Sequence, residues 1–195
     1  MYRDCPDPWG FAWRWYEQRK YALTVAALPR ARFRRALEPG CSIGVLTALL
    51  ARRCDEIVAT DVVEDALAAA RTRIAATPDA GRVECRTWAF GSAWGSLGRF
   101  DLIVLSEVAY YLHADALRAA LETAVDHLEP GGTLVCVHWR HPAPDYPLTG
   151  DEVHRIVHAT DVLSPLATYG DDDFRLDVFT RGPAISVATA DGVLG

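Results

Sequence analysis

Two glycines and an aspartate have the spacing of a nucleotide-type cofactor site. Gly40 and Gly44 lie between a short apolar segment and a helix-like one, and Asp61 ends the next apolar segment. Small residues in such a turn let the backbone approach a ligand, the following helix directs N–H groups at it, and a carboxylate holds ribose hydroxyls. The pattern therefore predicts a site for a ribose-containing cofactor.

The same turn departs from the patterns of dinucleotide and triphosphate sites. The dinucleotide pattern Gly-x-Gly-x-x-Gly would place glycines where this chain has Ser42 and Val45. No Gly-Lys-Ser/Thr follows, which excludes a P-loop. Glu38 and Asp61 make the turn acidic, so that it would repel a pyrophosphate. A cationic, adenosine-containing cofactor fits better, and S-adenosylmethionine is the prediction.

A second group of polar side chains follows the most apolar segment of the chain. Residues 101–106, DLIVLS, are typical of a central parallel strand buried on both faces. Because ligands of open parallel sheets bind beyond the carboxyl ends of the strands, we expect Ser106, Glu107, Tyr110 and Tyr111 to face a cleft. Helix capping and core packing are the alternative roles for these residues.

Histidines provide a third set of chemically capable side chains. His138, Trp139 and His141 lie at or after the end of the apolar segment 133–139 and are also expected to face the cleft. His138 is a candidate base because an unperturbed histidine titrates near neutrality, and a structural hydrogen-bonding role is the alternative.

His154 and His158 are four residues apart on one predicted helix, a spacing that can bind a metal ion. No acidic residue stands at the matching place for a metalloprotease motif. We therefore predict a solvated helix face here and no metal site.

The N-terminal segment carries more aromatic residues than one packing stripe requires. Residues 1–12 are predicted to form an arm, because two prolines oppose an early helix, and residues 13–28 a helix. This helix either packs its stripe on the core or forms a lid over a ligand. The aromatic residues concerned are Trp9, Trp13, Trp15, Tyr16 and Tyr21.

Strand-like and helix-like segments alternate and would bring these side chains together. The predicted strands are 33–38, 56–60, 83–88, 101–106 and 133–139, and the helices between and after them 45–52, 65–76, 115–128 and 151–159. Thr149 and Glu152 predict a capping box for the last helix. The alternation implies a parallel sheet with right-handed crossovers. Residues 166–170 and 174–181 lie too close together for a crossover helix and read as an antiparallel hairpin at the sheet edge.

These elements predict one α/β domain of Rossmann-like type. It would hold a mostly parallel seven-stranded sheet, a C-terminal antiparallel hairpin and helices on both faces. The length of 195 residues suits a single domain with a full core.

Composition limits the partners and the compartment. The net charge of −6 and the absence of a long basic block disfavour nucleic acid. No apolar run reaches the roughly 20 residues needed to cross a bilayer, so no membrane partner is predicted. The five cysteines are scattered and odd in number, as expected of reduced thiols in a cytoplasmic protein. No feature of the sequence specifies an oligomeric state.

The segment EPGCSIG resembles the first motif of class I S-adenosylmethionine-dependent methyltransferases, which is an acidic residue followed by x-Gly-x-Gly-x-Gly. Ser42 replaces the middle glycine, a tolerable departure because serine is small, and Pro39 is an unusual residue at its position. Asp61 matches the acidic residue that holds the ribose in that family. The terminal antiparallel hairpin also matches the sheet of the family.

A closer resemblance covers roughly residues 7–180. DPWGF, YEQRKY, LEPGCSIG, LIVLSEVAYYL and VHW, in that order, resemble the NodS group of nodulation-type N-methyltransferases, which act on an amino sugar of chitooligosaccharides. The resemblance implies an N-terminal arm and lid helix (1–30) packed on a class I methyltransferase domain (31–195), together one structural domain.

The resemblance also implies site residues. The cofactor-binding set is Glu38, Gly40, Cys41, Ser42, Gly44, Asp61, Val62, Trp88, Ala89, Phe90, Ser106 and Glu107. In this set Glu38 would lie near the ammonium group and an aromatic after the third strand would stack on adenine, with core packing as the alternative for Trp88 and Phe90. Cys41 serves only as a small residue.

On the acceptor side, the substrate-binding set is Trp9, Trp13, Tyr16, Tyr110, Tyr111, His138 and Trp139, and the catalytic set is Glu107, His138 and Tyr16. The expected activity is methyl transfer to the amine of a small molecule such as an amino sugar. Transfer to an oxygen or a carbon of another metabolite is the alternative, and a non-catalytic binding module is a third.

Overall fold

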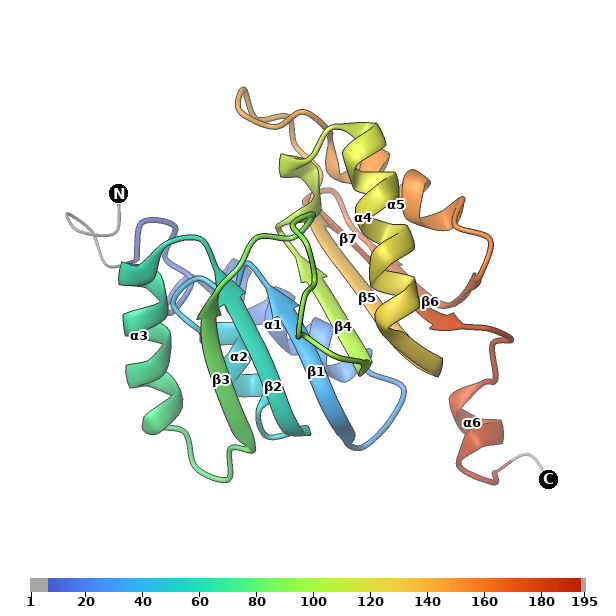
Figure 1. Ribbon diagram of the computed structural model, residues 1–195, viewed down its shortest axis with the longest axis horizontal. Helices are drawn as coiled ribbons and strands as arrows, with labels where there is room; N and C mark the ends of the chain where they lie inside the picture. Colours follow the sequence, from blue (N-terminus) through green and yellow to red (C-terminus); the bar gives the residue numbers. More distant parts are fainter. Residues whose placement is uncertain (1–6, 194–195) are drawn as a thin grey trace.

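The computed structural model describes residues 7–193 (Figure 1). The strands are β1 Phe33–Pro39, β2 Cys54–Asp61, β3 Arg82–Thr87, β4 Phe100–Ser106, β5 Leu128–Trp139, β6 Leu163–Gly170 and β7 Phe174–Arg181. The helices are α1 Trp15–Ala26, α2 Val45–Leu50, α3 Glu64–Ala75, α4 Ala114–His127, α5 Gly150–His158 and α6 Val187–Ala190, with a 3-10 turn, η1, at Ala109–Tyr111. Cys5 and the first half of the predicted arm lie outside the described residues.

The strands form one seven-stranded sheet in the order β3-β2-β1-β4-β5-β7-β6. Strands β1 to β5 are parallel, and β7 is inserted antiparallel between β5 and β6. The predicted α/β fold, its mostly parallel sheet and its C-terminal antiparallel hairpin are confirmed. The strand order reverses between β1 and β4, which is where open α/β sheets open a ligand crevice.

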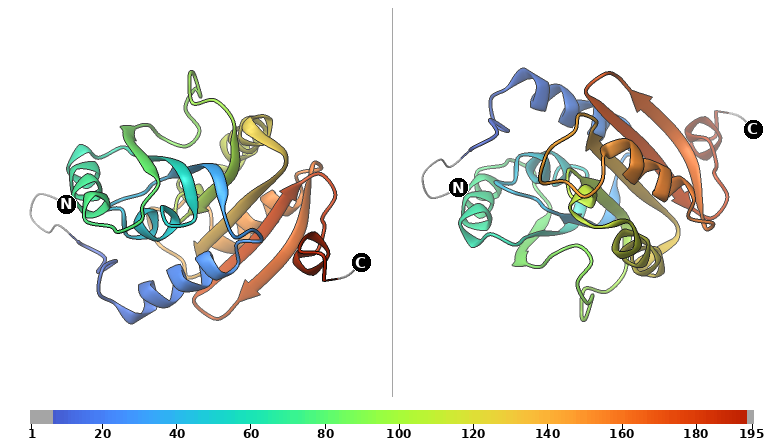
Figure 2. Two further views of the ribbon diagram at one scale, coloured as in Figure 1. Left: turned by 90° about the horizontal axis from the view of Figure 1, so that it is seen from below. Right: turned by 90° about the horizontal axis from the view of Figure 1, so that it is seen from above.

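Two hydrophobic cores cover the two faces of the sheet. Alternate residues of β4 serve different cores: Ile103 and Leu105 pack with α4 and α5, whereas Leu102 and Val104 pack with α1, α2 and α3. Figure 2 shows α1 and α4 on opposite sides of the sheet. Every residue of β4 is buried, as its continuous apolar sequence predicts.

Most predicted boundaries agree with the structure to within two residues. The first helix begins at Trp15 because Asp7 and Gly10 tie the preceding residues into a turn, in which the Asp7 carboxylate accepts from two backbone N–H groups. The fifth strand begins five residues earlier than predicted, at Leu128, because Phe100 pairs with Leu128 and the ladder then shifts register. The capping box of Thr149 and Glu152 is confirmed.

Within residues 7–193, no helix is long and apolar enough to cross a membrane.

Candidate active site

The turn after β1 has a left-handed backbone at three positions. Gly40, Ser42 and Gly44 have φ of 71°, 50° and 74°. A Cβ at Gly40 would approach the side chain of Val108 to 3.2 Å, and one at Gly44 would meet Ala70 of α3 at 2.9 Å. Gly40 therefore keeps open the space toward Val108, whereas Gly44 lets α2 pack closely on α3. Ser42 adopts a conformation that glycine adopts at lower cost.

Asp61 fixes this turn from the end of β2. Its Oδ2 accepts from the backbone N–H of Ser42 and its Oδ1 from that of Val63, both at 2.9 Å. A carboxylate has about four acceptor positions, so each oxygen keeps capacity for a further donor. Asp61 lines a large cavity and can accept from ligand hydroxyls there.

Glu38 lies behind the turn and lacks a complete set of partners. Its side chain is buried, and Oε2 has no hydrogen-bond partner among residues 7–193. Burial raises the pKa of Glu38 to about 8, and the negative charge of Asp61 acts in the same direction. A cationic ligand group at this place would satisfy the carboxylate.

The cavity beyond the carboxyl ends of the strands has a volume of about 700 Å³. A small recess shares Phe11, Gly40, Ser42 and Glu107 with the cavity and reaches Glu38, Cys41 and Ser106. The cavity is lined by residues of the N-terminal segment, the cofactor turn and the ends of β2 to β5, namely Trp9, Phe11, Arg14, Tyr16, Glu17, Lys20, Gly40, Ser42, Asp61, Val62, Val63, Trp88, Ala89, Phe90, Glu107, Val108, Tyr110, Tyr111, Leu112, Trp139 and Tyr146.

Aromatic side chains form the wall after β3. Trp88 donates its indole N–H to the carbonyl of Ala93 at 3.0 Å and contacts Trp94 edge-on, with ring centroids 5.3 Å apart. Phe90 is buried, yet it reaches the cavity surface together with Ala89. This wall is apolar and can hold a planar base.

Glu107 also lines the cavity, and its carboxylate accepts three hydrogen bonds. It has a φ of 55°, which turns the chain sharply after β4. Its Oε1 accepts from Lys20 Nζ at 2.6 Å, and its Oε2 accepts from the hydroxyl of Tyr110 at 2.8 Å and the backbone N–H of Trp139 at 3.0 Å. Three separate elements thus orient this one carboxylate.

Lys20 joins Glu107 to the N-terminal helix. Its Nζ is also 3.0 Å from Glu17 Oε2, and the Lys20 side chain is only 2% exposed. Burial alone would lower the pKa of Lys20, but the two carboxylates outweigh it and raise that pKa. Burial in turn raises the pKa of Glu17 against the opposing effect of Lys20. The cluster contains two acids and one cation, and it is anionic when both acids are ionised.

Tyr16 lies on the same helix face as Lys20. Its ring packs edge-on against Trp139 and Phe174, at centroid distances of 5.3 and 6.2 Å. Its hydroxyl is buried and has no hydrogen-bond partner within the described part of the chain. Burial and the nearby Glu107 raise the pKa of Tyr16, so the phenol stays neutral.

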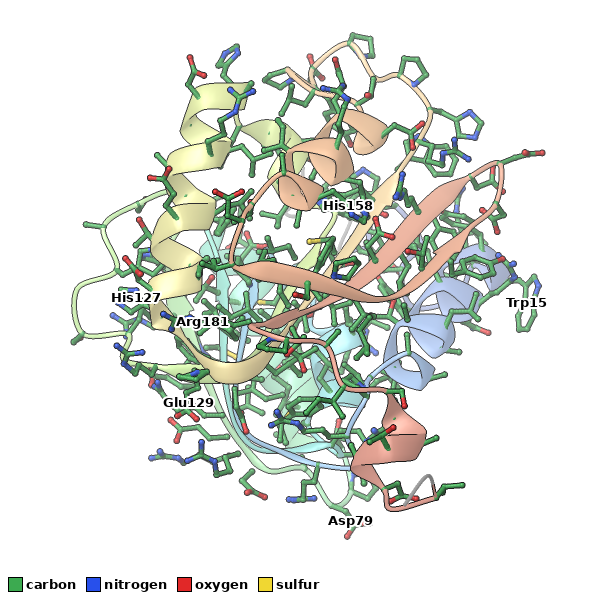
Figure 3. The ribbon with its side chains drawn as sticks, turned by 90° about the vertical axis from the view of Figure 1, so that its right-hand side faces the viewer. Trp15, Asp79, His127, Glu129, His158 and Arg181 are labelled. Carbon is green, nitrogen blue, oxygen red and sulfur yellow. The ribbon has the colours of Figure 1, made fainter. Side chains whose placement is uncertain are left out.

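Several predicted residues lie away from the cavity. Trp13 is 66% exposed and lines neither the cavity nor its recess, because the turn before α1 directs it outward. The neighbouring Trp15 also projects from the molecule (Figure 3). The expectation that His138 faces the cleft is wrong, since it is fully buried within β5. His141 is exposed and pairs with Asp173.

The expected solvated helix face on α5 is also wrong. His154 is fully buried, with its Nδ1 2.6 Å from Asp177 Oδ2, and His158 Nε2 lies 3.1 Å from the same oxygen. Both histidines face the sheet because α5 packs on β5 and β7.

Sequence reasoning missed Glu17 and Lys20 as site residues. A signal was present, since Tyr16 and Lys20 are four apart and Glu17 and Lys20 three apart, so that all three share one helix face. A charged pair on the face that also carries the aromatic stripe is the pattern of a buried ion pair. Phe11, Arg14 and Tyr146 line the cavity without a comparable signal in the sequence.

The fold and this cavity define a class I S-adenosylmethionine-dependent methyltransferase. The family model of Nodulation protein S (NodS) matches residues 2–143. A Nodulation protein S from Bradyrhizobium diazoefficiens is 32% identical over 147 residues, which cover 70% of this chain and 68% of that protein. The chain belongs to the NodS family.

Solved structures of methyltransferases are similar to this chain as well. The N-methyltransferase NodS from Bradyrhizobium japonicum WM9, in complex with S-adenosyl-L-homocysteine, has a TM-score of 0.79 and 25% identity, covering 91% of this chain and 93% of that one. A structure from Pseudomonas syringae described as a methyltransferase is 40% identical with a TM-score of 0.67, covering 86% of this chain and 100% of that one. S-adenosylmethionine is thus the cofactor of this enzyme.

Proposed function

We propose that this enzyme transfers the methyl group of S-adenosylmethionine to the nitrogen of a small amine, with an amino sugar as the acceptor. The observation that carries the proposal is the cluster of Glu17, Lys20 and Glu107 in the wall of an aromatic-lined cavity. An acidic pocket attracts an ammonium group, and the aromatic rings of Tyr110 and Tyr111 suit the apolar face of a sugar. The similar NodS from Bradyrhizobium japonicum is an N-methyltransferase.

The cofactor half of the proposal assigns the two acids of the turn. Asp61 would hold the ribose hydroxyls and Glu38 the ammonium group of the methionine moiety, whose charge would satisfy the unpartnered Oε2. Gly40, Cys41, Ser42 and Ser106 would cradle that moiety, Gly44 would act by letting α2 close the turn, and Val62, Trp88, Ala89 and Phe90 would enclose the adenosine.

Catalysis in this proposal is mainly alignment. The bound cofactor supplies an electrophilic methyl group with a neutral thioether as leaving group. Glu107, held by three donors, orients the amine against the methyl carbon and receives its proton directly or through water. Tyr16 offers its unpartnered hydroxyl oxygen to an amine N–H. The acceptor contacts are Trp9, Tyr16, Tyr110, Tyr111 and Trp139.

The test is transfer from methyl-labelled S-adenosylmethionine to paired acceptors. Chitooligosaccharides with one free amine should gain label on nitrogen, and the fully N-acetylated oligomers should not, because an amide nitrogen is not nucleophilic. The Glu107→Gln variant should bind S-adenosylhomocysteine normally and lose most of the transfer. Label found only on oxygen or carbon would overturn the assignment to nitrogen.

We place the reaction in the cytoplasm, with a small molecule rather than nucleic acid as partner. The cysteines Cys41, Cys54, Cys85 and Cys136 form no disulfide, as is usual in a reducing compartment. The net charge of −6 disfavours a polyanion.

A further inference from the structure

A chain of buried polar groups leads from the acceptor side of the cavity to the far side of β5. The backbone N–H of Ala109 donates to His138 Nε2 at 3.3 Å, and His138 Nδ1 lies 3.2 Å from His154 Nε2. His154 Nδ1 lies 2.6 Å from Asp177 Oδ2. All three side chains are fully buried, so solvent does not compete with these contacts.

These contacts define one protonation state. Since a backbone N–H can only donate, His138 accepts at Nε2 and carries its proton at Nδ1. That proton is donated to Nε2 of His154, which therefore carries its own proton at Nδ1 and donates it to Asp177. A second proton on either ring would place two donors face to face. Burial also lowers the pKa of both histidines and so favours the neutral rings.

The cavity end of this chain touches the groups that orient Glu107. The ring of His138 contacts that of Tyr110 edge-on, with centroids 5.4 Å apart, and Tyr110 donates to Glu107. Trp139, the next residue after His138, donates its backbone N–H to the same carboxylate. Two of the three donors to Glu107 therefore belong to Tyr110 and Trp139, which are direct neighbours of His138.

The outer end of the chain depends on the close approach of α5 to β5. A Cβ at Gly150 would collide with the carbonyl oxygen of Trp139 and lie 3.1 Å from the Cβ of His138. Glycine at this position and the capping box at Thr149 therefore set where α5 begins, and with it the depth at which His154 meets His138. Figure 3 shows His158, one turn further along α5, beside the outer strands.

The chain cannot relay a proton to the cavity, because its inner end is a backbone N–H, which does not titrate. We propose that His138 and His154 are positioning residues: they hold η1 in place and, through Tyr110 and Trp139, orient Glu107 for methyl transfer. This inference rests on the proposed placement of Glu107 at the acceptor, but it assigns a role to a network that contacts neither substrate nor cofactor.

The first test separates acceptor alignment from cofactor binding. In His138→Gln, the side-chain oxygen can still accept from Ala109, whereas the link to His154 is lost. His154→Phe keeps the ring and removes both hydrogen bonds. We expect kcat per folded enzyme to fall by about ten- to a hundredfold in His154→Phe and by less in His138→Gln. The affinity for S-adenosylhomocysteine should stay within about threefold of the original value, since Asp61 and the turn are untouched.

His127→Gln is the matched control. His127 is a partly buried histidine on α4 whose Nδ1 contacts the carbonyl of Thr123, away from the chain. Its replacement should change neither kcat nor cofactor affinity. If His154→Phe lowered only the melting temperature, with kcat and the acceptor KM of the folded fraction unchanged, the network would be structural and the inference would be overturned.

A second test uses the unaltered protein, so that it stands even where a variant fails to fold. Nitrogen-15 spectra of the histidine rings should show His138 and His154 both neutral and protonated at Nδ1 at pH 7. A proton on Nε2 of His138 would exclude the hydrogen bond from Ala109 and the proposal with it. Because these spectra need no acceptor, their failure is distinct from a failure to methylate amines.

Discussion

The two ends of the cavity are built in opposite ways. The cofactor end is formed by one short segment, from Glu38 to Gly44, and by Asp61 at the end of the neighbouring strand, and backbone N–H groups make its internal hydrogen bonds. At the acceptor end, Glu107 is held by Lys20 from α1, Tyr110 from η1 and Trp139 from β5. The hydrogen bonds of Asp61 join residues at most 19 positions apart in sequence, whereas Glu107 joins segments up to 87 positions apart.

Because of this difference, substitutions at the two ends should have different effects. At the cofactor end, loss of the charge of Glu38 or Asp61 removes ligand contacts and weakens the hydrogen bonds of Asp61 to the turn, while α2 remains packed on α3 through Gly44 and Ala70. At the acceptor end, charged side chains from distant segments depend on each other, so that loss of one leaves another buried and unpaired. We therefore expect loss of a charged side chain to alter folding mainly at the acceptor end and ligand binding mainly at the cofactor end.

Lys20→Met tests the acceptor end and should have the largest effect. It leaves Glu17 and Glu107 without their shared cation, and loss of one partner of a buried ion pair costs about 3–5 kcal/mol of unfolding free energy. Urea unfolding monitored by circular dichroism measures the change. Arg19→Met on the same helix is the control, because Arg19 pairs with Asp171 at the surface, where solvent screens the ion pair and its loss changes the free energy of unfolding little. Equal losses of unfolding free energy in the two variants would show that the buried cluster at the acceptor end is no more important for folding than a surface pair.

Asp61→Asn tests the cofactor end. The amide nitrogen would replace one of the two oxygens with which Asp61 accepts from Ser42 and Val63, and the charge that strengthens hydrogen bonds to ligand hydroxyls would be lost. We expect the affinity for S-adenosylhomocysteine to fall by about 2 kcal/mol, roughly thirtyfold, in titration calorimetry. Glu64→Gln nearby should have no effect, since Glu64 is exposed and pairs with Arg71. Unchanged affinity in Asp61→Asn would exclude Asp61 as a cofactor ligand.

Glu38 predicts a proton released on cofactor binding. With its pKa raised to about 8 it is protonated in the ligand-free fold at pH 7, whereas the ammonium group of the cofactor selects the carboxylate. Affinity should rise about tenfold per pH unit from about pH 5.5 to 7, where an α-ammonium group remains protonated. In the ligand-free protein the sign is reversed, because a raised pKa means stability that is lost as pH rises toward 8.

Calorimetry in buffers of different ionisation enthalpy measures this proton release. The Glu38→Gln variant should bind without proton release and with a flat pH dependence over the same range. Proton uptake, or a release that persists in the variant, would show that Glu38 does not meet the ammonium group.

The same contrast explains what sequence could predict. The sheet, its hairpin and the cofactor turn followed from local patterns: apolar strands, glycines at positive φ and an acid at a strand end. The pairing of Lys20 with Glu107 and the buried position of His138 did not, because no local pattern identifies the partner, Glu107 for the lysine and His154 for the histidine. Residue type alone could not tell a histidine facing the cavity from one facing α5.

Tyr16→Phe makes the smallest expected change and separates the two ends most cleanly. The hydroxyl of Tyr16 is buried without a partner in the described chain, so its removal should leave stability unchanged or raise it by up to about 1 kcal/mol. If the hydroxyl contacts the acceptor amine, the acceptor KM should rise by about three- to tenfold, a loss of roughly 1 kcal/mol, while cofactor affinity stays constant. Trp13→Phe is the control, since Trp13 lies outside the cavity and should change neither constant. A drop in stability without a change in KM would show that Tyr16 serves core packing. The acceptor would then be contacted by the tyrosines of η1 and not by Tyr16.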